Sequence, residues 1–123
     1  MAERYSSFAP GGTSWLLQRI TAAFLIGVLA FHFFQLHFVT HAFEVELAGT
    51  QARMENPAYY LTMVSFLIAA AFHGVNGVYN ALVNQGIEGT QKTALKWGLT
   101  AAGIVLVVQG IRVANAMAGV SIV

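Results

Sequence analysis

The sequence of 123 residues is 57% hydrophobic and only 9% charged. This composition is too apolar for a soluble domain of that length and is typical of an integral membrane protein. The net charge of +1 comes without a basic patch, so no nucleic-acid partner is expected. The absence of cysteine excludes disulfides, thiolate metal sites and iron–sulfur ligands from this chain, so a redox centre would be a cofactor held by histidine.

Three apolar segments follow an N-terminal tail, residues 1–14. The segments cover residues 15–39, 58–82 and 95–118. Each is long enough to cross a bilayer, which takes about 20 residues in a helix. Three spans cannot form a barrel, which needs about eight strands or more, so the spans must be helices. We therefore expect an all-α membrane protein with a single membrane-anchor domain over residues 1–123.

The charges outside the spans predict their orientation. The N-terminal side and the second connection carry basic residues: Arg4, Arg19, Lys92 and Lys96. The first connection carries three glutamates against one arginine: Glu44, Glu46, Glu55 and Arg53. Because basic segments stay on the cytoplasmic side, we expect the N-terminus in the cytoplasm.

The second segment is centred on a histidine without charged neighbours. From Asn56 to Asn84 the chain has no Asp, Glu, Lys or Arg, so His73 would lie inside the hydrocarbon layer. A polar side chain there is expensive and needs a partner, which makes it a candidate functional residue. Small residues lie one turn to either side of it: Ala69, Ala70, Gly74 and Gly77. They favour either close helix packing or room for a flat macrocycle, with His73 as an axial ligand of haem iron.

The other histidines, His32, His37 and His41, lie in the second half of the first segment. At about 100° per residue His37 shares a helix face with Arg19. His32 points away from that face and could be buried against another subunit. His41 lies one turn beyond His37, in the headgroup zone. A rise of about 1.5 Å per residue places His73 roughly 15 Å and His37 roughly 30 Å from the cytoplasmic side, too far apart for one haem. A second ligand at the level of His73 would come from another chain. The alternative within this chain is His32, whose depth differs from that of His73 by about 7 Å.

Arg19 lies within a turn of Ser14, Trp15 and Gln18. Arg19 could snorkel to lipid headgroups, and Trp15 could belong to the aromatic belt. Alternatively, the planar guanidinium suits a haem propionate or a quinone carbonyl, and the four residues would then belong to a quinone site. Arg112 in the third segment has a similar pair of interpretations, either snorkelling or holding a propionate of an outer haem.

Two stretches resemble a known family. SWLLQRITAAFLIGVLAFHF resembles the first span of the small hydrophobic membrane anchor of succinate dehydrogenases, where an Arg precedes a Thr/Ala-rich stretch. HGVNGVYNALVNQG resembles its second span, where a haem-ligating histidine is followed eleven and twelve residues later by an Asp-Tyr pair near the quinone. This chain has Asn84-Gln85 at that place and therefore lacks the tyrosine.

The resemblance implies three transmembrane helices that form half of a haem-binding helix bundle, completed by a second anchor subunit. It implies haem b on His73, with Arg19 near a propionate or the quinone and Asn84 at the quinone site. Anchors with two haems carry a histidine near the outer end of the first span, which suggests His37 as the ligand of a second haem iron. The other partners would be an iron–sulfur subunit, a flavoprotein subunit and the lipid of a prokaryotic plasma membrane.

By this resemblance the chain is a non-catalytic subunit that helps to bind haem b and quinone and passes electrons from the iron–sulfur subunit to the quinone pool. A fumarate reductase anchor, which runs in the other direction, is one alternative. A haem-free scaffold with packing histidines is another. An ion-coupled transporter is not expected, because the spans contain no acidic residue.

Overall fold

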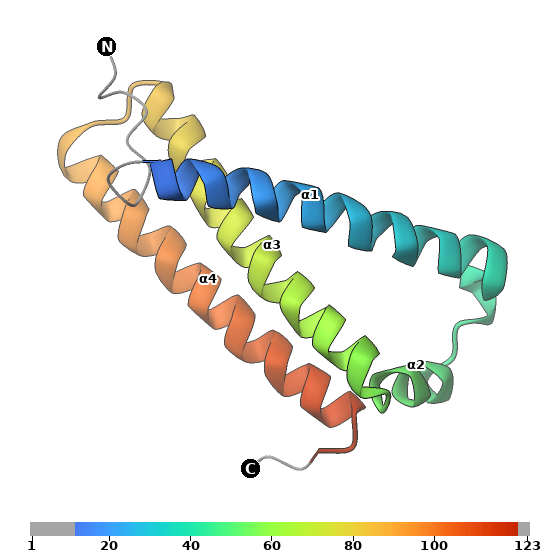
Figure 1. Ribbon diagram of the computed structural model, residues 1–123. Coiled ribbons are helices and arrows are strands. Elements are labelled where there is room, and N and C mark those ends of the chain that lie inside the picture. Colours follow the sequence, from blue (N-terminus) through green and yellow to red (C-terminus); the bar gives the residue numbers. More distant parts are fainter. Residues whose placement is uncertain (1–11, 121–123) are drawn as a thin grey trace.

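The computed structural model describes residues 12–120, and within them the chain is helical without strands (Figure 1). The elements are α1 (Gly12–Phe34), the π-helical η2 (Gln35–Val39), the 3-10 helix η3 (Ala42–Glu44), α2 (Leu47–Met54), α3 (Pro57–Asn84) and α4 (Gly89–Met117). Three stretches are long and apolar enough to cross a membrane: Gly12–Val39, Pro57–Asn84 and Gly89–Met117. The expected all-α membrane protein with three spanning helices is therefore confirmed.

The spanning helices begin before the apolar segments that predict them. Residues 12–14, expected in the tail, form the first turn of α1, and the rest of the tail lies outside the described residues. α4 begins at Gly89 rather than at residue 95, because its first turns are polar and carry no hydrophobic signal. A helix needs only its backbone hydrogen bonds, so polar turns can extend it beyond the apolar layer.

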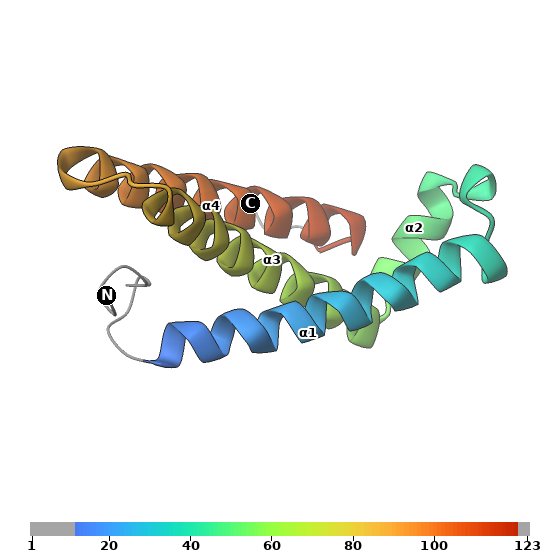
Figure 2. The same cartoon turned by 90° about the horizontal axis from the view of Figure 1, so that it is seen from above.

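α3 lies between α1 and α4 and runs antiparallel to both (Figure 1). The beginning of α1 contacts α3, and the end of α1 diverges from α3 (Figure 1). Seen from above, α1 runs at an angle across α3 (Figure 2). We call the membrane side where α1 begins the N side. The opposite side, where α3 begins and α2 lies, is the α2 side. The divergence leaves a wedge between α1 and α3 that opens towards the α2 side.

α3 begins and ends at strong local signals. The Oδ1 of Asn56 accepts hydrogen bonds from the backbone N–H groups of Ala58 (3.0 Å) and Tyr59 (3.2 Å), and proline occupies the first helical position. Beyond the end of the helix, Gly86 has a φ of +104°, which glycine adopts without steric cost. His73 lies eleven residues before the end of α3, or about 16 Å from its N-side terminus.

The connection between the first two spans is more ordered than its polar sequence indicates. Residues 40–56 contain η3 and α2, and α2 contacts both α3 and α4. With 8 residues, α2 is far too short to cross a membrane. Its last residue, Met54, is buried, so the connection is packed against the α2 side of the helices.

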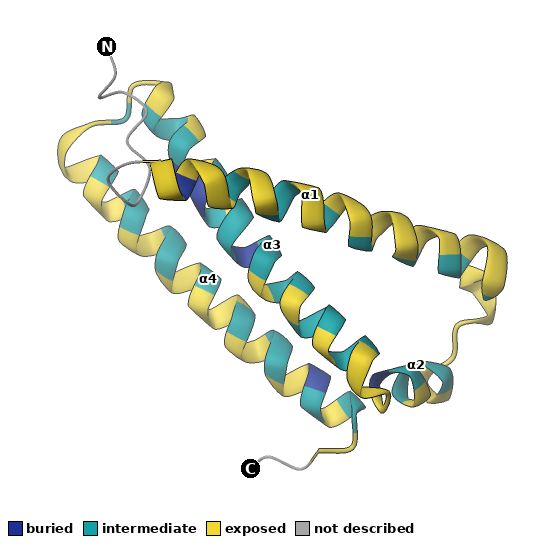
Figure 3. Cartoon of the chain, in the orientation of Figure 1, coloured by how far each residue is buried: buried dark blue, intermediate teal, exposed yellow. Residues whose placement is uncertain are grey.

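Large apolar side chains cover the outer faces of the spans and are exposed in the single chain (Figure 3). Within residues 12–120 the buried residues are few: Ser14, Met54, Ala71, Asn76, Tyr79 and Ala114. Exposed apolar patches of this extent mark surfaces that lipid or other subunits cover. Half of them, Ala71, Asn76 and Tyr79, lie along α3, the helix that has a neighbour on each side.

Candidate functional site

The imidazole of His73 faces α1 and is held by a hydroxyl. Its Nδ1 lies 3.1 Å from the Oγ1 of Thr21. The same hydroxyl donates its single hydrogen to the carbonyl oxygen of Leu17, at 2.7 Å. Because that hydrogen is already used, we assign the Thr21 oxygen as the acceptor and Nδ1 of His73 as the N–H donor. In this tautomer the lone pair of Nε2 is left to accept a ligand.

A network of polar side chains joins α1 to α3 beside His73. The Ser14 hydroxyl donates to Oδ1 of Asn76 (3.1 Å), and Nδ2 of Asn76 donates to Oε1 of Gln18 (2.7 Å). Nε2 of Gln18 donates in turn to the backbone carbonyl of His73 (3.2 Å). Asn76 is only 1% exposed, so its two bonds replace all contact with solvent. The network therefore fixes the register of α1 against the turn of α3 that carries His73.

The two glycines next to His73 have different surroundings. A Cβ at Gly77 would lie 3.2 Å from Nε2 of Gln18, so this glycine makes room for α1. A Cβ at Gly74 would meet no atom within 4 Å. Gly74 and Ala70 line an apolar groove of about 330 Å³ between α3 and α4. Close helix packing thus explains Gly77, whereas Gly74 lines a groove towards α4 that His73, whose ring faces α1, does not line.

The polar cluster expected near the beginning of α1 divides between two faces. Ser14 and Gln18 face α3 through the bonds to Asn76. Trp15 and Arg19 lie on the uncovered face: Trp15 is 59% exposed, and the guanidinium carbon of Arg19 lies 4.5 Å from its ring centre. No carboxylate within the described residues forms an ion pair with Arg19. Its guanidinium donors are therefore available on the outside of α1.

The contact between Thr21 and His73 sets the relative depth of the other candidates. Arg19 is two residues from Thr21, so it lies only about 3 Å from the level of His73, deeper than a residue at the end of the span. His32 and His37 are eleven and sixteen residues beyond Thr21, or about 17 and 24 Å along the helix. The differences in depth from His73 expected from the sequence are about 7 Å for His32 and about 15 Å for His37, and both are too small. Counting residues within each span ignores how far one helix is shifted along the other. Neither histidine could share one metal ion with His73.

His37 lies in η2, where the helix widens from α to π geometry. Its Nδ1 lies 3.1 Å from the carbonyl oxygen of Phe33, and the two rings stack with centroids 4.0 Å apart. Because a carbonyl can only accept, Nδ1 is the donor and Nε2 is left free. The wider turn rotates each residue by less than an α-helix does, so the periodicity that places His37 on the face of Arg19 does not hold beyond Phe34.

The remaining candidates lie near the ends of the bundle and are exposed. His41 stacks on Phe43 beyond the end of η2. Asn84 is the last residue of α3, on the N side. Arg112 lies near the end of α4, on the α2 side. The structure does not bring these three residues together with His73.

Thr21 and Asn76 belong to the site, although neither is among the residues expected from the sequence. A signal for them exists in the spacing. Ser14, Gln18 and Thr21 recur at i, i+4 and i+7, which is one face of a helix, and Asn76 follows His73 by three residues. Polar stripes on two spans pair with each other, because lipid cannot satisfy their hydrogen bonds.

Comparisons with known proteins agree with this architecture. A family model described as succinate dehydrogenase/fumarate reductase transmembrane subunit matches residues 2–111. The chain is 28% identical over 82 residues to the succinate dehydrogenase hydrophobic membrane anchor subunit of Archaeoglobus fulgidus, which covers 67% of this chain and 69% of that relative. No solved structure matches the chain. Because the family model spans most of the sequence, the chain belongs to the succinate dehydrogenase/fumarate reductase transmembrane subunit family, as a membrane anchor.

Proposed function

We propose that this anchor binds haem b through His73 and contributes to a quinone site, so that electrons pass from an iron–sulfur subunit to the quinone pool. It assembles with that subunit, a flavoprotein subunit and a second hydrophobic anchor subunit. The complex lies in a prokaryotic plasma membrane, with the N side in the cytoplasm. The chain itself is not catalytic, because succinate chemistry belongs to the flavoprotein.

The contact between the His73 ring and Thr21 is the observation that carries this proposal. Nδ1 lies 3.1 Å from the Thr21 hydroxyl, and in the tautomer assigned above Nε2 is left for a ligand, which is the usual arrangement of a metal-ligating histidine. Gly74, the next residue in α3, would meet no atom within 4 Å with an added Cβ, so it leaves space next to His73. A bound haem would supply a one-electron relay inside the membrane.

Each polar residue near His73 has a task in this proposal. Thr21 fixes the tautomer and the direction of the ring. Ser14 and Gln18 hold α1 in place through Asn76, so that the hydroxyl of Thr21 stays opposite His73. The second axial ligand comes from the second anchor subunit, because the described part of this chain has no other histidine at that level.

Haem content tests the assignment of His73. We expect His73→Ala to remove one haem per flavin from the purified complex, measured as pyridine haemochrome, and to abolish the corresponding signal in the reduced-minus-oxidised spectrum. Unchanged haem content would refute the assignment. A wild-type complex without haem would support the alternative of a haem-free scaffold.

The role of Thr21 can be tested separately with an isosteric change. Thr21→Val keeps the volume but removes the acceptor for Nδ1–H, and we expect about tenfold weaker haem retention and a shifted spectrum, as when other metal-ligating histidines lose their hydrogen-bond partner. Thr21→Ser should restore both. The matched control is Thr100→Val on α4, because the Thr100 hydroxyl also donates to the carbonyl four residues before it, at 2.7 Å, but contacts no histidine. Equal spectra for Thr21→Val and wild type would contradict the positioning role.

The exposed pair Arg19 and Trp15 is the part of the chain best placed to contact a quinone or a haem propionate. The planar guanidinium can give two parallel hydrogen bonds to oxygen, and the Trp15 ring holds it in place. Ser14 and Gln18 support this turn of α1 from behind, and Asn84 lies on the same side of the membrane. Quinone would therefore bind on the N side.

Substitution of the arginine separates a quinone contact from a general structural role. Arg19→Lys keeps the charge and loses the planar fork, so we expect slower quinone reduction with unchanged succinate oxidation by a soluble dye. If both activities fall together, the residue stabilises the complex instead. If neither changes, Arg19 does not contact the quinone.

A second haem on the α2 side is an extension of this proposal, with His37 as its ligand and Arg112 at a propionate. The bond from Nδ1–H of His37 to the Phe33 carbonyl leaves Nε2 for iron, and the same bond would also satisfy a packing histidine. Two haems per flavin, with one lost in His37→Leu, would support the ligand role. One haem per flavin in the wild type would assign His37 to packing.

The family includes anchors of both succinate dehydrogenases and fumarate reductases. A fumarate reductase anchor is therefore the alternative within the family. The relative rates of succinate oxidation and fumarate reduction by the purified complex distinguish the two directions.

A further inference from the structure

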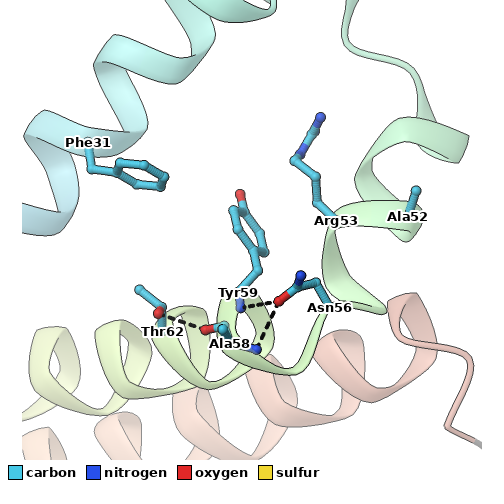
Figure 4. A pocket seen from close by; sticks show the side chains of 7 residues that line it. All are labelled: Phe31, Ala52, Arg53, Asn56, Ala58, Tyr59 and Thr62. Atoms are coloured by element: carbon cyan, nitrogen blue, oxygen red, sulfur yellow. Dashed lines mark hydrogen bonds between the residues drawn. The ribbon is translucent and has the colours of Figure 1, made fainter.

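A cavity of about 550 Å³ lies on the α2 side, in the wedge between α1, α2 and the beginning of α3 (Figure 4). Its lining residues are Phe31, Ala52, Arg53, Asn56, Ala58, Tyr59 and Thr62. Figure 4 shows the ring of Tyr59 rising from α3 between Phe31 of α1 and Arg53 of α2. The cavity is separate from the surroundings of His73, which lies eleven residues beyond Thr62 in α3.

The polar side chains of this cavity are hydrogen-bond donors with a net positive charge. Arg53 is half-buried and gives one bond, from Nη2 to Oγ1 of Thr50 (3.1 Å), so most of its guanidinium donors are free. The Oδ1 of Asn56 is occupied by the backbone N–H groups that it caps, which leaves its Nδ2 as a donor. Tyr59 adds a hydroxyl. Among the described residues no Asp or Glu lines the cavity, so its polar part suits an anion.

The position of the cavity indicates what kind of anion it would meet. Arg53 and Asn56 lie directly before α3, whose apolar span begins at Pro57. The donors are therefore at the level where the hydrocarbon layer ends and lipid phosphates lie. The other walls, Phe31 and Ala58 with the methyl group of Thr62, belong to the spanning helices and are apolar. A ligand with an anionic head and a hydrocarbon tail fits both parts.

We propose that this cavity binds a membrane phospholipid. Its phosphodiester lies against Arg53, Asn56 and Tyr59, and its acyl chains follow Phe31 and Thr62 into the wedge between α1 and α3. The phospholipid fills the space that opens where α1 diverges from α3, and it links α2 to both helices. This proposal does not depend on haem or quinone at His73.

Native mass spectrometry of the purified complex can count the bound lipid. After delipidation, the wild-type complex is titrated with dioleoylphosphatidylglycerol, which carries one phosphodiester charge. We expect Arg53→Gln to weaken binding of one lipid about tenfold, because it removes a charge-assisted hydrogen bond. Tyr59→Phe removes a neutral hydrogen bond and should weaken it by about fivefold. The control Lys92→Gln, at a cation of α4 outside the cavity, should leave the number of bound lipids unchanged.

Further ligands identify the source of the anion. Dioleoylglycerol has the same acyl chains without phosphate and should bind equally poorly to the wild type and to Arg53→Gln. Displacement of the lipid by inorganic phosphate would overturn the proposal in favour of a free-anion site. Equal phosphatidylglycerol binding by the wild type and Arg53→Gln would also overturn it. So would loss of the second anchor subunit from Arg53→Gln with an unchanged lipid count, because Arg53 would then pair with a carboxylate of that subunit.

Discussion

The two sides of α3 are joined to their neighbours by different physical means. Towards α1 the contact is polar, with hydrogen bonds through Asn76 and through the ring of His73. Towards α4 the contact depends on close approach: a Cβ at Gly103 would lie 2.9 Å from Val75, and one at Gly110 would overlap the side chain of Leu67. One hydrogen bond, from the Tyr60 hydroxyl to Oδ1 of Asn115, also joins α3 to α4 near the α2 side. The α4 side therefore packs mainly by shape around the middle of α3, whereas the α1 side is specified there by hydrogen bonding.

The difference between the two interfaces explains where a functional histidine can be held. The close contacts at Gly103 and Gly110 fix how near α4 approaches α3, but they orient no polar group. A hydrogen bond also orients its partners, because its distance and angle must both be kept. His73 faces the interface that is fixed by hydrogen bonds, and its ring direction therefore follows from the register of α1. The α3–α4 interface provides a stable support for that turn.

The strongest test of this comparison removes the centre of the polar interface. Asn76→Leu has a similar volume but leaves Ser14 and Gln18 without their partner inside a buried contact, so we expect a loss of roughly 2–3 kcal/mol in stability. The loss is measured as a lower thermal midpoint of the purified complex. The matched control is Asn80→Leu one turn later in α3, a half-buried asparagine without a side-chain hydrogen bond among the described residues. If both variants behave alike, the network does not specify the α1–α3 contact.

A smaller effect is expected when the apolar interface is overfilled. In Gly110→Ala the new methyl group would meet three atoms of the Leu67 side chain, the farthest of them at 3.3 Å, so that side chain must move, which costs roughly 1–2 kcal/mol. The double variant with Leu67→Ala should recover part of the loss. Gly98→Ala is the control, since a Cβ there meets nothing within 4 Å. Additive effects of the Gly110 and Leu67 changes would contradict direct packing between them.

The smallest effect on stability is expected at Gly74, where an added Cβ would meet no atom of the described residues within 4 Å. Gly74→Ala should change the free energy of unfolding by less than about 0.5 kcal/mol, because its Cβ has no neighbour within 4 Å. The thermal midpoint of the purified complex should therefore stay close to that of the wild type. If a haem face lies beside Gly74, the same change should nevertheless lower haem per flavin. Gly77→Ala should lower the thermal midpoint without a direct effect on haem per flavin, because its Cβ meets Nε2 of Gln18 at 3.2 Å. Unaltered haem in Gly74→Ala would place the cofactor elsewhere around His73.

Much of the fold follows from the sequence, because a bilayer leaves few choices for the backbone. Length and hydropathy are sufficient to predict three helical spans, since unpaired backbone groups cannot remain in hydrocarbon. The Asn56-Pro57 pair predicts the start of α3 within a residue, because a cap and its proline act locally. The α2 helix is not predictable in this way. Its eight residues have no strong apolar pattern, and they are ordered by contact with α3 and α4.

The candidate site, too, is predicted from the sequence only in part. The charge-free surroundings of His73 identify it from the sequence, because an isolated histidine in hydrocarbon must have a partner. Which partner it has depends on how far α1 is shifted along α3, and counting within each span cannot determine that shift. The tertiary structure alone brings Thr21 opposite His73, places Arg19 at nearly the same level, and moves His32 and His37 far from it. The physical reason is that hydrogen bonds between two helices act across the interface, whereas sequence periodicity describes each helix separately.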